Sequence, residues 1–205
     1  MPMKKILNLL IVLSLFLTSC IKLNLTVGGR QVNELSADEM SLVVTPKPSE
    51  KLSKDLKNDN LLYSVTGKQL KDFLKTKDTC LVYSWYAFCK SENCFSMCAV
   101  KNYCDKKGYD LIVVTEDIRL PDYIYRASCL EYPLMAINMN YYNKSTKNKN
   151  KRAFKADLIY PHSVKSKEFR TGGRYYLFYK GEYLHLVDAD EIKAANTGSS
   201  IYQNM

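Results

Sequence analysis

The chain of 205 residues has little histidine, a single tryptophan and no long hydrophobic run. Its two histidines, His162 and His185, lie far apart in the sequence, and nothing indicates a Ser-His-Asp triad, a phosphate-binding loop or a glycosidase carboxylate pair. Internal repeats and paired Cys-x-x-Cys motifs are also missing. The longest apolar stretch, residues 6–17, is too short to span a bilayer comfortably. These absences leave the seven cysteines as the residues on which a chemical function would depend.

Composition indicates one globular domain with additional segments. The hydrophobic fraction of 46% and the charged fraction of 25% are typical of folded proteins. The formal net charge is +9, and much of the excess lies in a basic insertion, residues 143–156, which contains Lys144, Lys147, Lys149, Lys151, Arg152 and Lys155. A basic run can bind nucleic acid or anionic lipid, but its asparagine and lysine content favours a solvated surface loop. We therefore expect no nucleic-acid partner.

The first residues have the pattern of an export signal. Lys4 and Lys5 precede the apolar stretch 6–17, and small residues follow it. The run Leu17-Thr18-Ser19-Cys20 resembles a bacterial lipobox, which implies a signal peptide over 1–19 and a lipid on Cys20. Several acyl chains would anchor the protein stably to a membrane. The alternative is an ordinary signal peptide followed by an incidental cysteine.

The segment after the signal predicts a tether. Residues 20–58 are polar, contain Gly28-Gly29 and two prolines, and show no sustained period, which suits a domain that stands off a membrane. Ile21 after Cys20, with no acidic run behind it, favours attachment to the outer membrane facing the periplasm of a bacterial cell envelope. Disulfides are permitted in that compartment. The folded domain is then expected over 59–196, with a polar tail over 197–205.

Hydrophobic periodicity predicts an α/β domain. Strands are expected at 61–65, 80–86, 111–115, 174–179 and 183–187, with 134–139 as a further candidate. Helices are expected at 67–76, at 92–107, after Pro121, near Phe154 to Ile159, and around Ile192. The apolar run 80–86 is continuous, which indicates a strand covered on both faces. The order β-α-β-α-β-β-α predicts a three-layer sandwich around a central mixed sheet.

One stretch resembles the thioredoxin fold. Leu81-Val82-Tyr83-Ser84-Trp85-Tyr86-Ala87-Phe88-Cys89 shows the family's apolar strand, tryptophan, two residues, an aromatic residue and then the nucleophilic cysteine. Lys180-Gly181-Glu182 is similar to the family's hairpin. The resemblance is closest to lipid-anchored or periplasmic thioredoxin-like proteins of Bacteroidota-type bacteria, and it covers roughly 61–195. It implies a thioredoxin-like fold and thiol–disulfide exchange with a protein substrate. We expect no cofactor and no metal.

Under this resemblance Cys89 is the exposed nucleophile and Cys94 is the resolving thiol. Cys89 is expected just before a helix, where unpaired amides lower the pKa of a thiol. The chain departs from the family's pattern at two places. Four residues rather than two separate Cys89 from Cys94, and Gly172-Gly173-Arg174 stands where a cis-proline is usual.

Those departures favour an alternative in which the cysteines form fixed bridges in a non-catalytic interaction module. Cys80, Cys98, Cys104 and Cys129 are candidates for structural disulfides. The six cysteines after Cys20 allow fifteen pairings, which sequence cannot resolve. Cys98 has Cys89, Cys80 or Cys129 as candidate partners, and Cys104 has Cys129 or Cys80. A zinc site is a third interpretation, but the spacings are not those of zinc knuckles.

Overall fold

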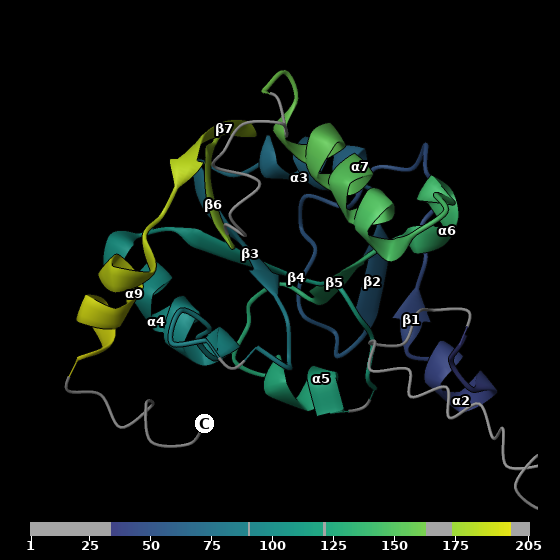
Figure 1. Ribbon diagram of the computed structural model, residues 1–205, viewed down its shortest axis with the longest axis horizontal. Helices are drawn as coiled ribbons and strands as arrows, with labels where there is room; N and C mark the ends of the chain where they lie inside the picture. The colour runs from purple at the N-terminus through teal and green to yellow at the C-terminus, as the bar shows by residue number, and fades with distance from the viewer. Residues whose placement is uncertain (1–33, 90, 121, 163–173, 198–205) are drawn as a thin grey trace, which may run out of the picture.

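The described part of the chain folds around a seven-stranded mixed sheet (Figure 1). The structure is a computed structural model, and it describes residues 34–89, 91–120, 122–162 and 174–197. The strands lie in the spatial order β1-β2-β5-β4-β3-β6-β7. Their bounds are β1 Val43–Val44, β2 Leu62–Val65, β3 Thr79–Trp85, β4 Asp110–Thr115, β5 Leu134–Ile137, β6 Tyr175–Tyr179 and β7 Glu182–Leu186.

Strand β3 is an interior strand with different neighbours on its two sides. It pairs in parallel with β4, with Leu81 opposite Leu111, and antiparallel with β6, with Leu81 opposite Leu177. Its residues are apolar almost throughout because both of its faces are covered, as the continuous hydrophobic run predicted. The antiparallel hairpin β6–β7 is also confirmed.

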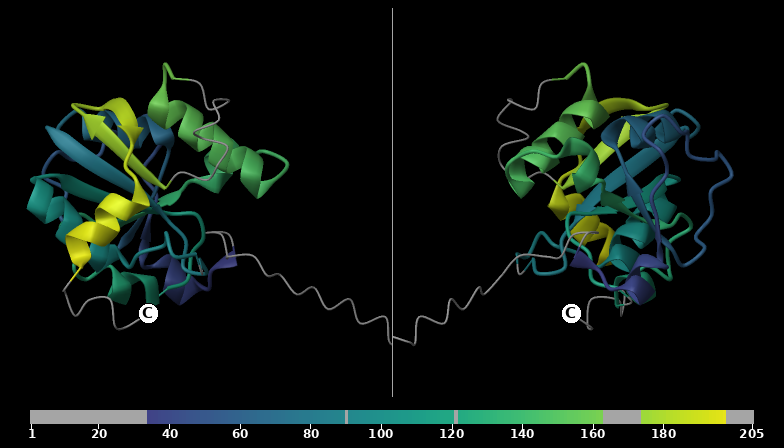
Figure 2. Two further views of the ribbon diagram at one scale, coloured as in Figure 1. Left: turned by 60° about the vertical axis from the view of Figure 1, so that its left-hand side comes forward. Right: turned by 90° about the vertical axis from the view of Figure 1, so that its right-hand side faces the viewer.

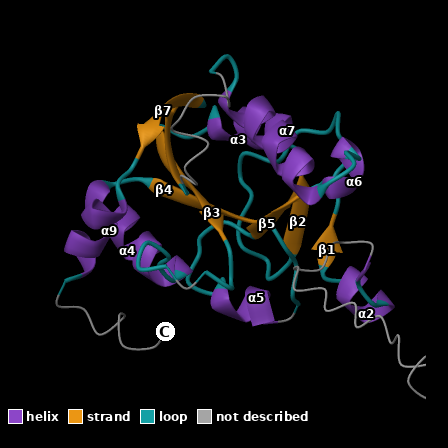
Figure 3. Cartoon of the chain, in the orientation of Figure 1, coloured by secondary structure: helices purple, strands orange, loops and turns teal. Residues whose placement is uncertain are grey.

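Helices cover both faces of the sheet and make three layers (Figure 3). One face carries α3 (Gly67–Leu74), α6 (Met139–Tyr142) and α7 (Lys147–Ile159). The other face carries α4 (Met97–Lys107), α5 (Asp122–Arg126) and α9 (Ala189–Asn196), and α2 (Ala37–Met40) lies beside β1 at the sheet edge. In the left view of Figure 2, α7 (green) and α9 (yellow) lie on different sides of the strands. The α/β class with a central mixed sheet is therefore confirmed.

Alternation along β3 assigns its side chains to two separate hydrophobic cores. Leu81, Tyr83 and Trp85 join the core under α4, α5 and α9. Cys80 and Val82 join the core under α3 and α7. Successive side chains of a strand point to opposite faces, so the sheet itself separates these two groups.

Two helix ends lie where they were predicted, the start of α3 at Gly67 and the end of α4 at Lys107. Thr66 and Gln69 form a capping box at the start of α3, in which each side chain accepts from the other residue's backbone amide. Gly108 ends α4 in the left-handed conformation, with a φ of 71°. The start of α4 differs from the prediction of residue 92, because Ser96 caps the helix and its side chain accepts from the Ala99 amide. The helix therefore begins at Met97.

The segment expected as a tether enters the fold from residue 34 onward. Val43 and Val44 pair with β2 at the edge of the sheet, and Leu52 is buried. The Gln69 side chain donates to the carbonyls of Lys47 and Glu50, at 2.8 and 3.0 Å. These bonds fasten the segment to α3. The predicted signal peptide and Cys20 lie outside the described residues, and so do 20–33 and 198–205 of the tether and tail.

Part of the basic insertion is a helix rather than a solvated loop. In α7 the side chains of Phe154, Leu158 and Ile159 are buried, so this helix is longer than the short one predicted there. It packs closely on α3 at Gly67, where a Cβ atom would lie 2.3 Å from the Phe154 carbonyl oxygen. Only glycine permits that approach.

The last helix is attached to α4 by a buried amide. Asn196, the last residue of the expected domain, is fully buried, and its side chain donates to the Ala99 carbonyl at 3.1 Å. The side chain of Asn102 donates to its amide oxygen at 2.8 Å. Within the described ranges, none of the helices has the length and apolar character needed to cross a bilayer.

Candidate functional site

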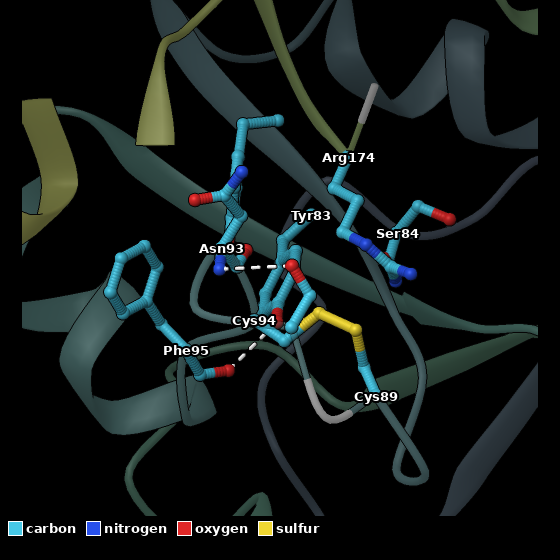
Figure 4. Close-up of a disulfide and its surroundings, with 9 residues drawn as sticks. Tyr83, Ser84, Cys89, Asn93, Cys94, Phe95 and Arg174 are labelled. Carbon is cyan, nitrogen blue, oxygen red and sulfur yellow. Dashed lines mark hydrogen bonds between the residues drawn. A yellow bond between two sulfur atoms is a disulfide. The ribbon is translucent and has the colours of Figure 1, made fainter. Parts of the chain in front are cut away.

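A disulfide between Cys89 and Cys94, named here the turn disulfide, lies just beyond the carboxyl end of β3 (Figure 4). The two Cα atoms are 5.9 Å apart. The Cys89 amide donates to the Tyr86 carbonyl at 3.1 Å, and the Cys94 amide donates to the Ser91 carbonyl at 2.9 Å. Both cysteines thus lie in turns ahead of α4. The prediction that Cys89 directly precedes a helix is wrong, and Cys94 lies ahead of α4 rather than inside the helix predicted at 92–107.

The two sulfurs of the turn disulfide differ in accessibility. Cys94 is only 9% exposed, whereas Cys89 is half-buried. Exchange begins when a thiolate reaches one sulfur of the bond. An external thiol therefore has access through Cys89, and Cys94 is the leaving sulfur.

Two tyrosine hydroxyls form hydrogen bonds with the residues on either side of Cys94. The Tyr83 hydroxyl on β3 donates to the Phe95 carbonyl at 2.7 Å, and the Tyr175 hydroxyl on β6 donates to the Asn93 carbonyl at 2.8 Å. Their rings stack with centroids 4.8 Å apart. Burial raises the pKa of Tyr83 well above its usual value, so its hydroxyl stays a donor. Cys94 is therefore fixed between two anchored neighbours.

A groove of about 590 Å³ runs beside the turn disulfide. Trp85, Met97 and the turn itself line one part of it, and Tyr125 and Ser128 line another. Tyr125 is 80% exposed. Phe88 directly precedes Cys89 in the sequence, and the Arg119 guanidinium lies 4.0 Å from the centre of its ring. The groove offers aromatic and aliphatic contacts to a polypeptide placed over the sulfurs.

A second disulfide, named here the staple disulfide, joins Cys98 in the first turn of α4 to Cys129 beyond α5. Its Cα atoms are 5.8 Å apart, and both residues are half-buried. Cys98 also lines the groove. Cys129 was one of three candidate partners for Cys98 on sequence grounds.

Cys80 and Cys104, also candidates for structural disulfides, are free and buried. Cys80 lies in the core under α3 and Cys104 in the core under α4, so the sheet separates them. Burial raises the pKa of Cys80 well above its usual value and that of Cys104 to about 12. Both thiols stay protonated at neutral pH, which makes them poor nucleophiles.

Polar residues behind the turn are paired with one another. The Ser84 hydroxyl donates to Glu116 at 3.2 Å, and Lys151 forms an ion pair with the same carboxylate. Arg174 continues the pairing of β6, because its carbonyl accepts from the Ser84 amide at 2.8 Å. Gly172 and Gly173, where the resemblance to thioredoxins would place a cis-proline, lie outside the described residues.

The cysteine pairing bears directly on the zinc interpretation. Four of the clustered cysteines are joined in the two disulfides, so their sulfurs are not thiolate ligands. Among the described residues, the structure has no group of three or more histidine, cysteine, aspartate or glutamate side chains that could hold a metal ion.

The turn was predictable from the sequence, but its surroundings were not. Tyr83 and Tyr175 were assigned to strands without a role, and no local pattern links them to Asn93 or Phe95. Tyr125 and the staple disulfide were not connected with the groove. Comparisons of the chain with protein-family models, with curated proteins and with solved structures find no match.

Proposed function

We propose that this protein is a thioredoxin-like lipoprotein of the bacterial cell envelope that exchanges thiols and disulfides through Cys89 and Cys94. The observation that carries the proposal is the turn disulfide at the end of an interior strand, with one accessible sulfur and one buried sulfur. The mixed sheet and the terminal hairpin support the thioredoxin-like part. The lipobox-like run ending at Cys20 supports membrane attachment, with the domain facing the periplasm from the outer membrane.

The reduced site would act on a substrate disulfide in two balanced steps. The Cys89 thiolate attacks one substrate sulfur, so a Cys89–substrate bond forms and the other substrate sulfur leaves as a thiolate. The Cys94 thiolate then attacks Cys89, which restores the turn disulfide and releases the second substrate thiolate. Two electrons pass from the cysteine pair to the substrate. The reverse sequence would oxidise a substrate dithiol.

The test is reduction of insulin disulfides by the purified domain with dithiothreitol as the electron donor. We expect wild type to accelerate the reaction and Cys89→Ser to abolish the acceleration, because its hydroxyl cannot attack a disulfide. Cys94→Ser is expected to accumulate a Cys89–insulin mixed disulfide, visible by mass spectrometry. Cys104→Ala, which removes a buried thiol outside the site, is the matched control. Equal and negligible rates for wild type and Cys89→Ser would overturn the proposal.

A non-catalytic interaction module is the second candidate function, and the staple disulfide is the observation that favours it. That bond holds α4 against the segment beyond α5, on either side of a groove with an exposed tyrosine. Under this candidate both disulfides are fixed supports for a protein-binding surface. It predicts that both resist reduction by glutathione in the native protein, whereas exchange at Cys89 predicts that the turn disulfide opens first.

A further inference from the structure

The two disulfides share one groove. Cys89 and Cys94 line it from the turn, and Cys98 lines it from the first turn of α4. Arg126 and Ser128 line the same groove on the side from which Cys129 reaches Cys98. No layer of the fold separates the staple disulfide from the turn disulfide, in contrast to Cys80 and Cys104.

Cys98 has the position that favours a thiolate. It lies in the first turn of an eleven-residue helix, where unpaired amides and the helix dipole stabilise negative charge. This position was predicted for Cys89, but the helix begins after Ser96. When the staple disulfide is reduced, Cys98 is therefore the thiol best placed to ionise and attack.

Cys94 is the sulfur that external thiols reach least. It is 9% exposed, and the anchoring of Asn93 and Phe95 by two tyrosines keeps it in place. A thiol already held in the groove is therefore better placed than an external one to attack this sulfur. Cys98 follows it by four residues and lines the same groove.

We propose that Cys98 and Cys129 form a second redox pair that passes electrons internally to the turn disulfide. The Cys98 thiolate attacks Cys94, so a Cys94–Cys98 bond forms, the Cys89–Cys94 bond breaks, and Cys89 leaves as a thiolate. The Cys129 thiolate then attacks Cys98, which restores the staple disulfide and releases Cys94 as a thiolate. Two electrons thus move from the second pair to the first, and an external dithiol acting on the staple disulfide replaces them.

This relay rests on the proposed exchange at Cys89, but a trapping experiment tests it separately. The full chain carrying Cys89→Ser and Cys129→Ser keeps only Cys94 and Cys98 of the four paired cysteines. After treatment with oxidised glutathione, alkylation and digestion, mass spectrometry should find a Cys94–Cys98 disulfide. Free thiols or separate glutathione adducts at both positions would overturn the relay. Cys89→Ser with Cys98→Ser is the control, and it should form no Cys94–Cys129 bond.

The insulin assay gives a second test of the relay, because single and multiple turnover can be measured separately. Cys98→Ser with Cys129→Ser removes the relay but leaves Cys89 and Cys94. We expect severalfold slower multiple-turnover reduction with dithiothreitol, because the turn disulfide must then be reduced directly. The pre-reduced variant should slow far less in a single turnover, which does not use the relay, than in multiple turnover, whereas a merely structural loss would slow both alike. Unchanged multiple turnover contradicts the relay, whereas failure of wild type itself contradicts exchange at Cys89.

Discussion

Removing the staple disulfide should destabilise the domain more than removing the turn disulfide. The cysteines of the staple disulfide are 31 residues apart, and those of the turn disulfide are 5 apart. A crosslink lowers the entropy of the unfolded chain by a constant plus an amount that grows with the logarithm of loop length. These separations therefore correspond to about 3.7 and about 2 kcal/mol of unfolding free energy. Cys98→Ser with Cys129→Ser should therefore cost about 1.7 kcal/mol more than Cys89→Ala with Cys94→Ala.

Urea unfolding without reductant measures this difference. Trp85 is the only tryptophan, is 5% exposed, and contacts the Tyr123 ring edge-on at 4.7 Å, so its fluorescence reports the loss of the core. With a slope of about 2 kcal/mol per molar, the staple variant should unfold at a urea concentration about 1.8 M lower than wild type. A staple variant at least as stable as the turn variant would refute the loop-length argument, because native contacts would then outweigh the entropy of the unfolded chain.

Two further predictions concern single side chains. Tyr175→Phe removes the hydrogen bond to the Asn93 carbonyl, which should lower the free energy of unfolding by about 1 kcal/mol. The same substitution should speed reduction of the turn disulfide by dithiothreitol. Tyr125→Phe, at an exposed ring, is the control and should change neither quantity. Burial raises the pKa of Asp117, so the native state binds the proton of this carboxyl more tightly than the unfolded state does. The stability of the protein should therefore fall as the pH rises from the usual aspartate pKa through the raised pKa. In Asp117→Asn the amide oxygen can still accept from the Tyr123 hydroxyl, but the side chain no longer titrates. Urea midpoints measured across acidic pH should therefore lose this pH dependence. An unchanged pH dependence would assign it to another group.

Local patterns were sufficient to predict much of the fold. The unbroken apolar run of β3 indicated a strand covered on both faces, and the Thr66–Gln69 capping box placed the start of α3. Each of these signals depends on residues within a few positions of one another, which is where sequence periodicity is informative. Strand β1 was missed because its two residues are too few to show a period.

The site was less predictable because its geometry comes from distant segments. The helix predicted from residue 92 begins at Met97 instead, and its first residue decides which cysteine meets the helix amides. Tyr175 is 82 residues from the carbonyl that it anchors, so no local pattern could assign it. The pairing of Cys98 with Cys129 likewise depends on how α5 returns to α4, which spacing alone does not determine.

The buried amide of Asn196 connects the end of the domain to the start of the proposed relay. Its donation to the Ala99 carbonyl fixes α9 onto the residue that directly follows Cys98. A shortened form that stops before Asn196 would leave this carbonyl and the Asn102 side chain without that partner, next to the first turn of α4. The functional boundary of the domain therefore falls after Asn196, and a fusion or cleavage site belongs beyond it.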